Sequence, residues 1–277
     1  MNDIKTLLVH TDGGQHCADR LRMARALARQ LDAQLHALYS VRSAFTETPI
    51  EFATGGVIPS TLAHELDESR LASARKVKAQ GLAEPGVPFE WHEGHGLWFS
   101  TFTQQARYAD LLVLGQHDPE DINSGMPTDF VESVVIASGR PALVLPYVET
   151  TRTLGTEVLV AWKETPEAAR AVSAALPLLQ RARRVHVAMW GESEAPETSQ
   201  PLDIRSYLQA HGVQADVHQH GAAGAEVGDL MQSLAVDLSA DLLVMGCYGH
   251  ARAREFVLGG ASRTVLRTMV LPVLTAH

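Results

Sequence analysis

The stretch Ala109-Asp110-Leu111-Leu112-Val113-Leu114-Gly115 recurs as Ala240-Asp241-Leu242-Leu243-Val244-Met245-Gly246, 131 residues further along the chain. Each copy is a short apolar run that follows an aspartate and ends in a glycine, which is typical of a buried strand closed by a turn. Pro141 and Pro272 keep the same separation, so the register does not slip. The chain is therefore predicted to be a tandem duplication.

Both halves alternate strands with helices. A buried first strand is predicted at residues 7–11 of one half and 158–162 of the other, and apolar positions at helical spacing follow each. Further strands are predicted at 35–41, 89–92 and 142–145, and at 185–189, 215–218 and 273–274. This alternation indicates parallel sheets with right-handed crossovers. The predicted fold class is α/β, with two tandem doubly wound domains, each built on a five-stranded parallel sheet, at 1–148 and 154–277.

The first half carries an insert at residues 42–75, which contains Pro49, Gly55-Gly56 and Pro59 before a polar helical stretch that starts at Ser60. Such a segment predicts a surface excursion or flap. The linker at 148–155 is short, so the two halves are expected to pack against each other.

Composition excludes several classes of function. The formal net charge is −9 and no run of Lys or Arg exceeds a pair, so no nucleic-acid partner is expected. No apolar stretch is long enough to span a bilayer and the amino terminus enters a strand directly, so we expect a cytoplasmic protein with no membrane partner. Cys17 and Cys247 fit a reducing compartment and supply no cysteine-based metal framework.

The loop after the second copy is rich in glycine and reads Gly246-x2-Gly249-x9-Gly259-Gly260-Ala261-Ser262 before a helix predicted at 263–269. Glycines allow backbone N–H groups to close on an oxyanion, and a helix start adds unpaired amides and partial positive charge. The loop and the helix start add positive character through His250, Arg252, Arg254 and Arg263. The pattern predicts a polyphosphate site beyond the carboxyl ends of the strands, where strand order reverses.

With these motifs, the chain resembles a tandem universal stress protein, and the resemblance covers nearly the whole of both halves. It implies the adenine-nucleotide alpha-hydrolase-like fold and an adenine nucleotide (ATP, ADP or AMP) in the second half, with Mg²⁺ as an accompanying ion. Phosphate contacts are implied at Gly246, Gly249 and Gly259. The family's hydroxyl position holds Gly260 and its acidic position holds Lys163, so Ser262, after Ala261, could supply the hydroxyl and Lys163 could face phosphate.

The first half keeps Asp12-Gly13-Gly14 at its first strand but has lost the glycine loop. Its loop carries Asp118, Glu120 and Asp121, and Thr128-Asp129 stands where the closing Gly and Ser are expected. Three carboxylates would repel a phosphate tail, so this half is not expected to bind nucleotide in the family's manner.

Two other functions compete with a nucleotide-binding stress protein. One is a ligand-free interaction scaffold with both sites degenerate, which Gly260 and Lys163 favour. The other is a nucleotidyl-transfer enzyme, which lacks support because neither first strand is followed by a Ser-Gly-Gly-x-Asp-Ser turn or by a His-x-x-His helix opening. The chain has no Gly-Lys-Ser/Thr phosphate loop, so we expect no enzyme, no catalytic residue and at most a very slow ATPase.

Two further expectations concern partners and metals. The last strands of the two halves are expected to pair, as an internal pseudo-dimer or between two chains in a homodimer. Two histidine pairs, His92 with His95 and His218 with His220, suggest a metal site, but no Cys or carboxylate is expected to complete either set. We therefore predict surface histidines and no metal site.

Overall fold

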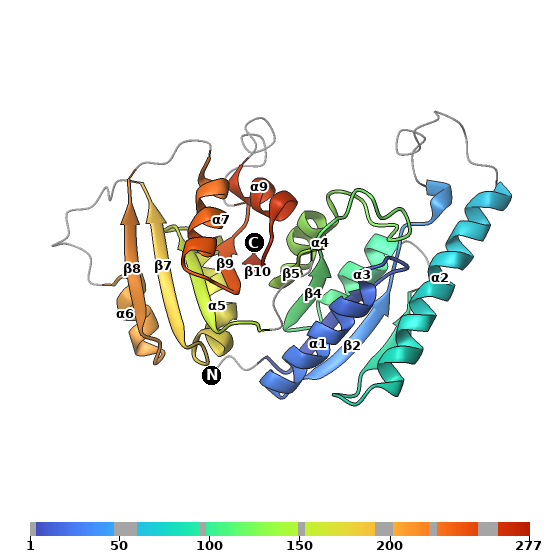
Figure 1. The fold of residues 1–277 in the computed structure, drawn as a ribbon, viewed down its shortest axis with the longest axis horizontal. Coiled ribbons are helices and arrows are strands. Elements are labelled where there is room, and N and C mark those ends of the chain that lie inside the picture. The colour runs from blue at the N-terminus through green and yellow to red at the C-terminus, as the bar shows by residue number, and fades with distance from the viewer. Residues whose placement is uncertain are drawn as a thin grey trace. The chain divides into compact units, whose positions relative to one another are not determined.

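The computed structural model describes residues 4–46, 60–94, 98–148, 153–191, 202–221, 226–248 and 260–277. The chain divides into two compact units, Ile4–Arg140 and Pro141–His277, called the first and second unit below. Both are α/β units, as Figure 1 shows by the alternation of arrows and coils along the colour scale.

The first unit contains four parallel strands in the order β3-β2-β1-β4. Its strands are β1 (Thr6–Thr11), β2 (Gln34–Tyr39), β3 (Glu90–Glu93) and β4 (Leu111–Gly115). Its helices are α1 (Cys17–Leu31), α2 (Ser60–Ala83), α3 (Trp98–Ala106) and α4 (Phe130–Ser138), with a 3-10 turn η1 at Ala44–Thr46. Strand β4, the first copy of the repeated stretch, is buried throughout, as its unbroken apolar run predicts.

The second unit contains six strands in the order β5-β10-β9-β6-β7-β8. Its strands are β5 (Ala142–Leu145), β6 (Glu157–Trp162), β7 (Arg184–Trp190), β8 (Ala215–His220), β9 (Leu242–Gly246) and β10 (Val273–Ala276). Its helices are α5 (Pro166–Leu179), α6 (Ile204–Ala210), α7 (Val227–Asp237) and α9 (Ala261–Thr268).

One strand pair departs from the parallel arrangement. From the sequence, β5 is predicted to be the fifth parallel strand of the first half. In the structure it lies in the second unit and pairs antiparallel with β10, with Leu143 opposite Leu274. The pairing confirms the expected contact between the last strands of the two halves. Each of these strands enters through a proline and is buried throughout, so the ladder covers an edge that each would otherwise expose.

The strand register confirms the internal repeat. Leu7 of β1 pairs with Leu111 of β4, and Val158 of β6 pairs with Leu242 of β9. The two halves therefore place their first and fourth strands side by side in the same register, and corresponding residues can be compared position by position.

The described part of the predicted insert is closely packed. Helix α2 begins at Ser60, as expected, and most of its described side chains are exposed or half-buried while one side packs on the first unit. A Cβ on Gly13 would lie 2.6 Å from the Arg70 Cα atom, so α2 presses on the turn after β1 and needs glycine there. Arg70 itself is 2% exposed. Its buried guanidinium is satisfied by donating to the carbonyls of Ile122 (2.6 Å) and Arg42 (3.4 Å). Residues 47–59 of the insert lie outside the described residues.

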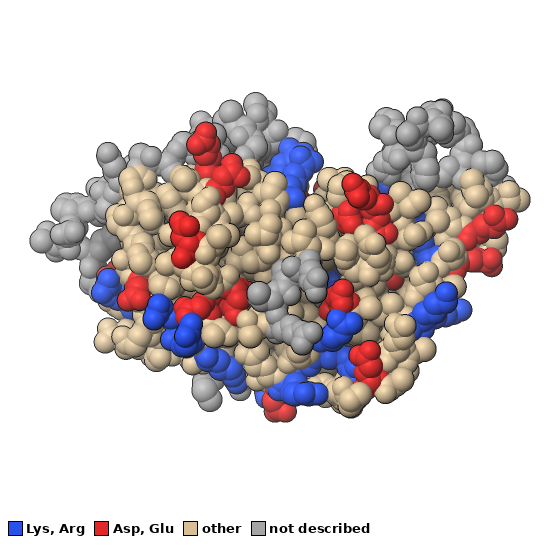
Figure 2. Space-filling view, in the orientation of Figure 1, with Lys and Arg blue, Asp and Glu red and all other residues tan. Residues whose placement is uncertain are grey.

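Two surface properties bear on partners. Among the described residues, no helix is long and apolar enough to cross a membrane. On the face shown in Figure 2, the described acidic and basic side chains are interspersed.

Candidate functional site

The candidate nucleotide site lies where strand order reverses in the second unit. Strands β7 and β8 extend from one side of β6, and β9 and β10 from the other. The carboxyl ends of β6 and β9 are therefore neighbours, and α5 and α9 follow these two strands in the chain. Open α/β sheets bind ligands at such a reversal.

Gly246 is required by close packing. A Cβ at this position would lie 2.4 Å from the Ala168 backbone nitrogen and 2.7 Å from the Glu167 carbonyl carbon. The first turn of α5 therefore rests directly on the end of β9. That turn is fixed by Pro166 at its start and by Thr165, whose hydroxyl accepts from the Ala168 amide at 3.3 Å.

Ser262 anchors the start of the glycine loop. Its side chain is buried, and its hydroxyl oxygen accepts from the backbone N–H of Tyr248 at 3.3 Å. Tyr248 has a φ of 60°, the left-handed conformation, so the chain turns sharply two residues after β9 ends. A hydroxyl can accept and donate at once, so this bond leaves Ser262 able to donate to an anion.

Gly260 is the N-cap of α9, and Ala261 is the first residue of that helix. The Gly260 carbonyl accepts from the amides of Arg263 and Thr264, and no described side chain caps the helix start. The first amides of α9 thus carry the partial positive charge of a helix N-terminus.

Lys163 follows β6 and is exposed, and its carbonyl accepts from the Thr165 amide at 2.7 Å. The structure thus places Lys163, Gly246, Gly260, Ala261 and Ser262 at the ends of the strands or the start of α9. The other candidate residues, Gly249, His250, Arg252 and Gly259, lie outside the described residues.

The corresponding place in the first unit is occupied by a buried ion pair. Asp12, after β1, accepts from the Arg20 guanidinium of α1 at 2.5 Å, and both side chains are nearly inaccessible to water. Arg20 also donates to the His10 carbonyl at 2.7 Å. Burial by itself lowers the pKa of Arg20, but the charges and hydrogen bonds of Asp12 and Cys17 together raise it. A Cβ on Gly115 would lie 2.2 Å from the guanidinium, so Arg20 covers the end of β4.

The first unit's loop closes over the same turn. Asp121 accepts from the Gln15 amide at 2.8 Å, and Asp118 accepts from the Gln15 side chain (3.2 Å) and lies 3.0 Å from His16 Nε2. Burial by itself raises the pKa of Asp118, but hydrogen bonds from the Glu120 amide, His16 and Gln15 lower it below its usual range. These carboxylates therefore bind the protein's own first turn.

His10 lies behind this ion pair and packs against the rings of Phe102 and Phe130, which also contact each other. Its Nε2 donates to the Ser40 carbonyl at 2.8 Å, so the neutral ring carries its proton there. Complete burial lowers the pKa of His10 to about 4, against a smaller opposing effect of Asp12. Nothing in the sequence indicates this neutral histidine beyond its place in an apolar strand.

Comparison with known proteins supports the fold. Neither a protein-family model nor a curated protein sequence matches the chain. A universal stress protein from Archaeoglobus fulgidus DSM 4304 is 16% identical over 98% of this chain and 95% of its own, with a TM-score of 0.64. A functionally unknown protein from Pseudomonas aeruginosa PAO1 is 18% identical over 99% and 92%, with a TM-score of 0.59. A candidate universal stress protein from Pseudomonas aeruginosa UCBPP-PA14 is also 18% identical, over 99% and 93%, with a TM-score of 0.60.

These likenesses span the full length of the chain. They confirm that it has the tandem fold of universal stress proteins, as the repeated stretch and the glycine loop predict.

Replacing Gly246 by alanine is predicted to destabilise the second unit by about 1–3 kcal/mol, because the added methyl group would overlap the backbone of α5. Urea unfolding of the full chain measures the loss. Gly221→Ala is the control, since a Cβ there meets nothing within 4 Å. Equal unfolding free energies for the two variants would contradict the packing described for Gly246.

The pKa of His10 predicts a pH dependence of stability. Because its folded pKa is about 4 against 6.5 unfolded, the unfolded chain binds a proton first as the pH falls, and stability present above pH 6.5 is lost toward pH 4. The unfolding free energy of the wild type should fall relative to His10→Phe by up to about 1.4 kcal/mol per pH unit in this window. Urea titrations at pH 7, 6 and 5 measure it, and parallel pH profiles for the two proteins would exclude a neutral buried His10.

Proposed function

We propose that this chain is a tandem universal stress protein that binds one adenine nucleotide, at the glycine loop of the second unit. The first unit is proposed to be closed to nucleotide by its own side chains. Support comes from the full-length likeness in fold, from the glycine spacing, and from the contrast in charge between the two units.

That contrast is the observation on which the proposal rests. When the two copies are aligned by sequence, Lys163 corresponds to Asp12 of the first unit, Gly249 to Asp118, and Arg252 to Asp121. Positions that carry carboxylates in the first unit thus carry lysine, glycine and arginine in the second. The change replaces repulsion of a phosphate chain by attraction.

A difference in side-chain size between the two units also favours nucleotide binding in the second unit. The sequence offset between the two first strands aligns Ala171, which is buried on α5, with Arg20. A methyl group therefore replaces the guanidinium, and the backbone of α5, not a charged side chain, lies against Gly246 at the end of β9. The uncapped start of α9 and the Ser262 hydroxyl stand on the same side of the strands as Lys163, which suits a phosphate chain.

The proposed role is binding and signalling without catalysis. A Gly-Lys-Ser/Thr phosphate loop is absent from the sequence, so we propose at most a very slow ATPase, with any Mg²⁺ arriving on the nucleotide. A second candidate is a ligand-free scaffold. The exposed Lys163, in place of the family's carboxylate, and Gly260, in place of its hydroxyl, favour that alternative.

Added ATP is predicted to stabilise the full chain, by about 2.7 kcal/mol when its concentration is a hundredfold above the dissociation constant. Gly249→Asp, which copies Asp118 into the second loop, should abolish the effect because its carboxylate would repel the phosphates. Thermal unfolding with and without ATP measures the shift, and chromatography of the denatured protein detects nucleotide retained from the cell.

Gly221→Asp is the matched control, since it introduces the same charge at an exposed position of the same unit. Its ATP shift should equal that of the wild type. If the wild type shows neither a shift nor retained nucleotide, the scaffold is the better description. A shift that survives Gly249→Asp would place the nucleotide elsewhere.

A further inference from the structure

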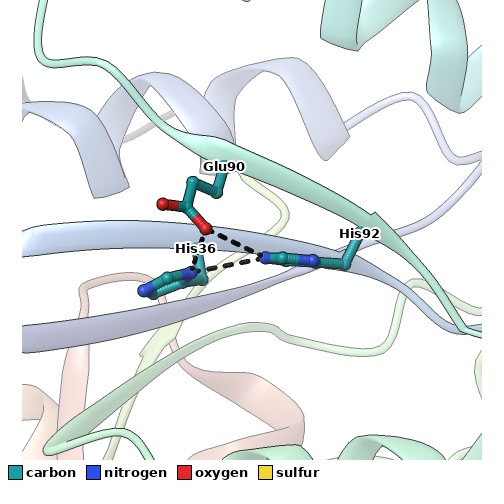
Figure 3. Close-up of side chains that lie close together, drawn as sticks. All are labelled: His36, Glu90 and His92. Carbon is teal, nitrogen blue, oxygen red and sulfur yellow. Dashed lines mark hydrogen bonds and ion pairs between the residues drawn. The ribbon is translucent and has the colours of Figure 1, made fainter.

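Two histidines and a glutamate meet at the edge of the first unit's sheet. His36 lies on β2, and Glu90 and His92 lie on the edge strand β3, where Glu90 is opposite His36 in the register. All three side chains project from the same face of the pleat and converge, as Figure 3 shows. The expectation that no carboxylate accompanies His92 is therefore wrong, and its histidine partner is His36 of the neighbouring strand. His95 lies outside the described residues.

The distances suit a metal ion. His36 Nδ1 lies 3.3 Å from His92 Nε2 and 3.5 Å from Glu90 Oε2, and His92 Nε2 lies 3.7 Å from the same oxygen. Bonds of about 2.1 Å to Zn²⁺ in tetrahedral geometry set neighbouring ligand atoms about 3.4 Å apart. The three atoms thus form one face of a tetrahedron of the required size.

An ion can reach this cluster. The side chains of His36, His92 and Glu90 are 28%, 49% and 73% exposed, so a path from solvent exists. A cavity of about 440 Å³ adjoins the cluster, and both histidines line it with Thr101 and Gln105 of α3 and with Tyr108. A metal held by three protein atoms would have its fourth position available for water or a small ligand.

The second unit has a histidine pair at the corresponding positions, which supports a metal site at His36 and His92 independently. In the second unit the same register positions hold His186, Asp216 and His218, again histidine, acid, histidine. His186 Nδ1 lies 3.1 Å from His218 Nε2, the same pair of nitrogens as in the first unit. Both units therefore share the histidine pair, whereas the carboxylate joins the two imidazoles in the first unit alone among the described residues.

A second cluster in the first unit, His16 with Asp118 and Asp121, also has ligand atoms within 4.8 Å of one another. Its carboxylate oxygens already accept from the amides of Gln15, Glu120 and Asn123. That cluster is explained by the closure of the first unit's loop. The cluster at His36 closes no loop and caps no helix.

We propose that His36, Glu90 and His92 form a binding site for a divalent transition-metal ion of the Zn²⁺ class, open on its fourth side to the adjoining cavity. Two imidazoles and one carboxylate are donors that such ions prefer, whereas Mg²⁺ and Ca²⁺ prefer oxygen ligands alone. The corresponding pair His186 and His218 forms a weaker site of the same kind. This proposal does not depend on nucleotide binding in the second unit.

The test is calorimetric titration of the chelator-treated full chain with Zn²⁺, in the presence of excess Mg²⁺. The wild type should bind one ion tightly, and His36→Gln and His92→Gln should weaken that site by at least about tenfold, since loss of a ligand costs no less than loss of an outer partner. His64→Gln, on an exposed helix position beside Glu68, is the matched control and should leave the site unchanged.

If a histidine variant fails to fold, Glu90→Gln still tests the proposal. The Glu90 side chain is largely exposed, so this substitution should leave the folded core unchanged. It should weaken Zn²⁺ binding in the same way, while His186→Gln should affect only the weaker site. The proposal would be overturned if the wild type did not bind Zn²⁺, or if the wild type and Glu90→Gln bound Zn²⁺ with equal affinity.

Discussion

The buried ion pair between Asp12 and Arg20 determines the character of the first unit. Two charges in a dry interior are tolerated only when each is fully satisfied, and Asp12 also accepts from the Gly14 amide while Arg20 also donates to the His10 carbonyl. Loss of one partner from such a pair costs about 3–5 kcal/mol. The pair thus joins the end of β1 to α1, and its guanidinium covers Gly115 at the end of β4.

The second unit reaches the same fold without that pair. Its first helix is fixed by Thr165 and Pro166, and it approaches β9 so closely that only glycine is tolerated at 246. With Ala171 in place of Arg20 and Lys163 in place of Asp12, no corresponding ion pair can form. The fold is thus independent of what occupies the strand ends, and function depends on the side chains placed there.

Much of the fold could be predicted from the sequence, because a repeated stretch with a constant offset specifies both the strands and their equivalence. The pairing of β5 with β10 followed from their places as last strands, but its antiparallel direction did not. The packing of α2 on Gly13 was missed because a polar helix with buried Arg70 looks like a surface segment. The partner of His92 was missed because His36 lies 56 residues away and only the strand register brings them together.

The central proposal is that one fold, used twice, binds nucleotide in the second unit alone, because side chains of the first unit occupy its own strand ends. Isothermal titration of the full chain with ATP tests it most directly, because it counts sites. The account predicts a single ATP per chain, unaffected by Asp121→Ala in the first unit. Two equivalent sites, or one that is lost with Asp121, would contradict it.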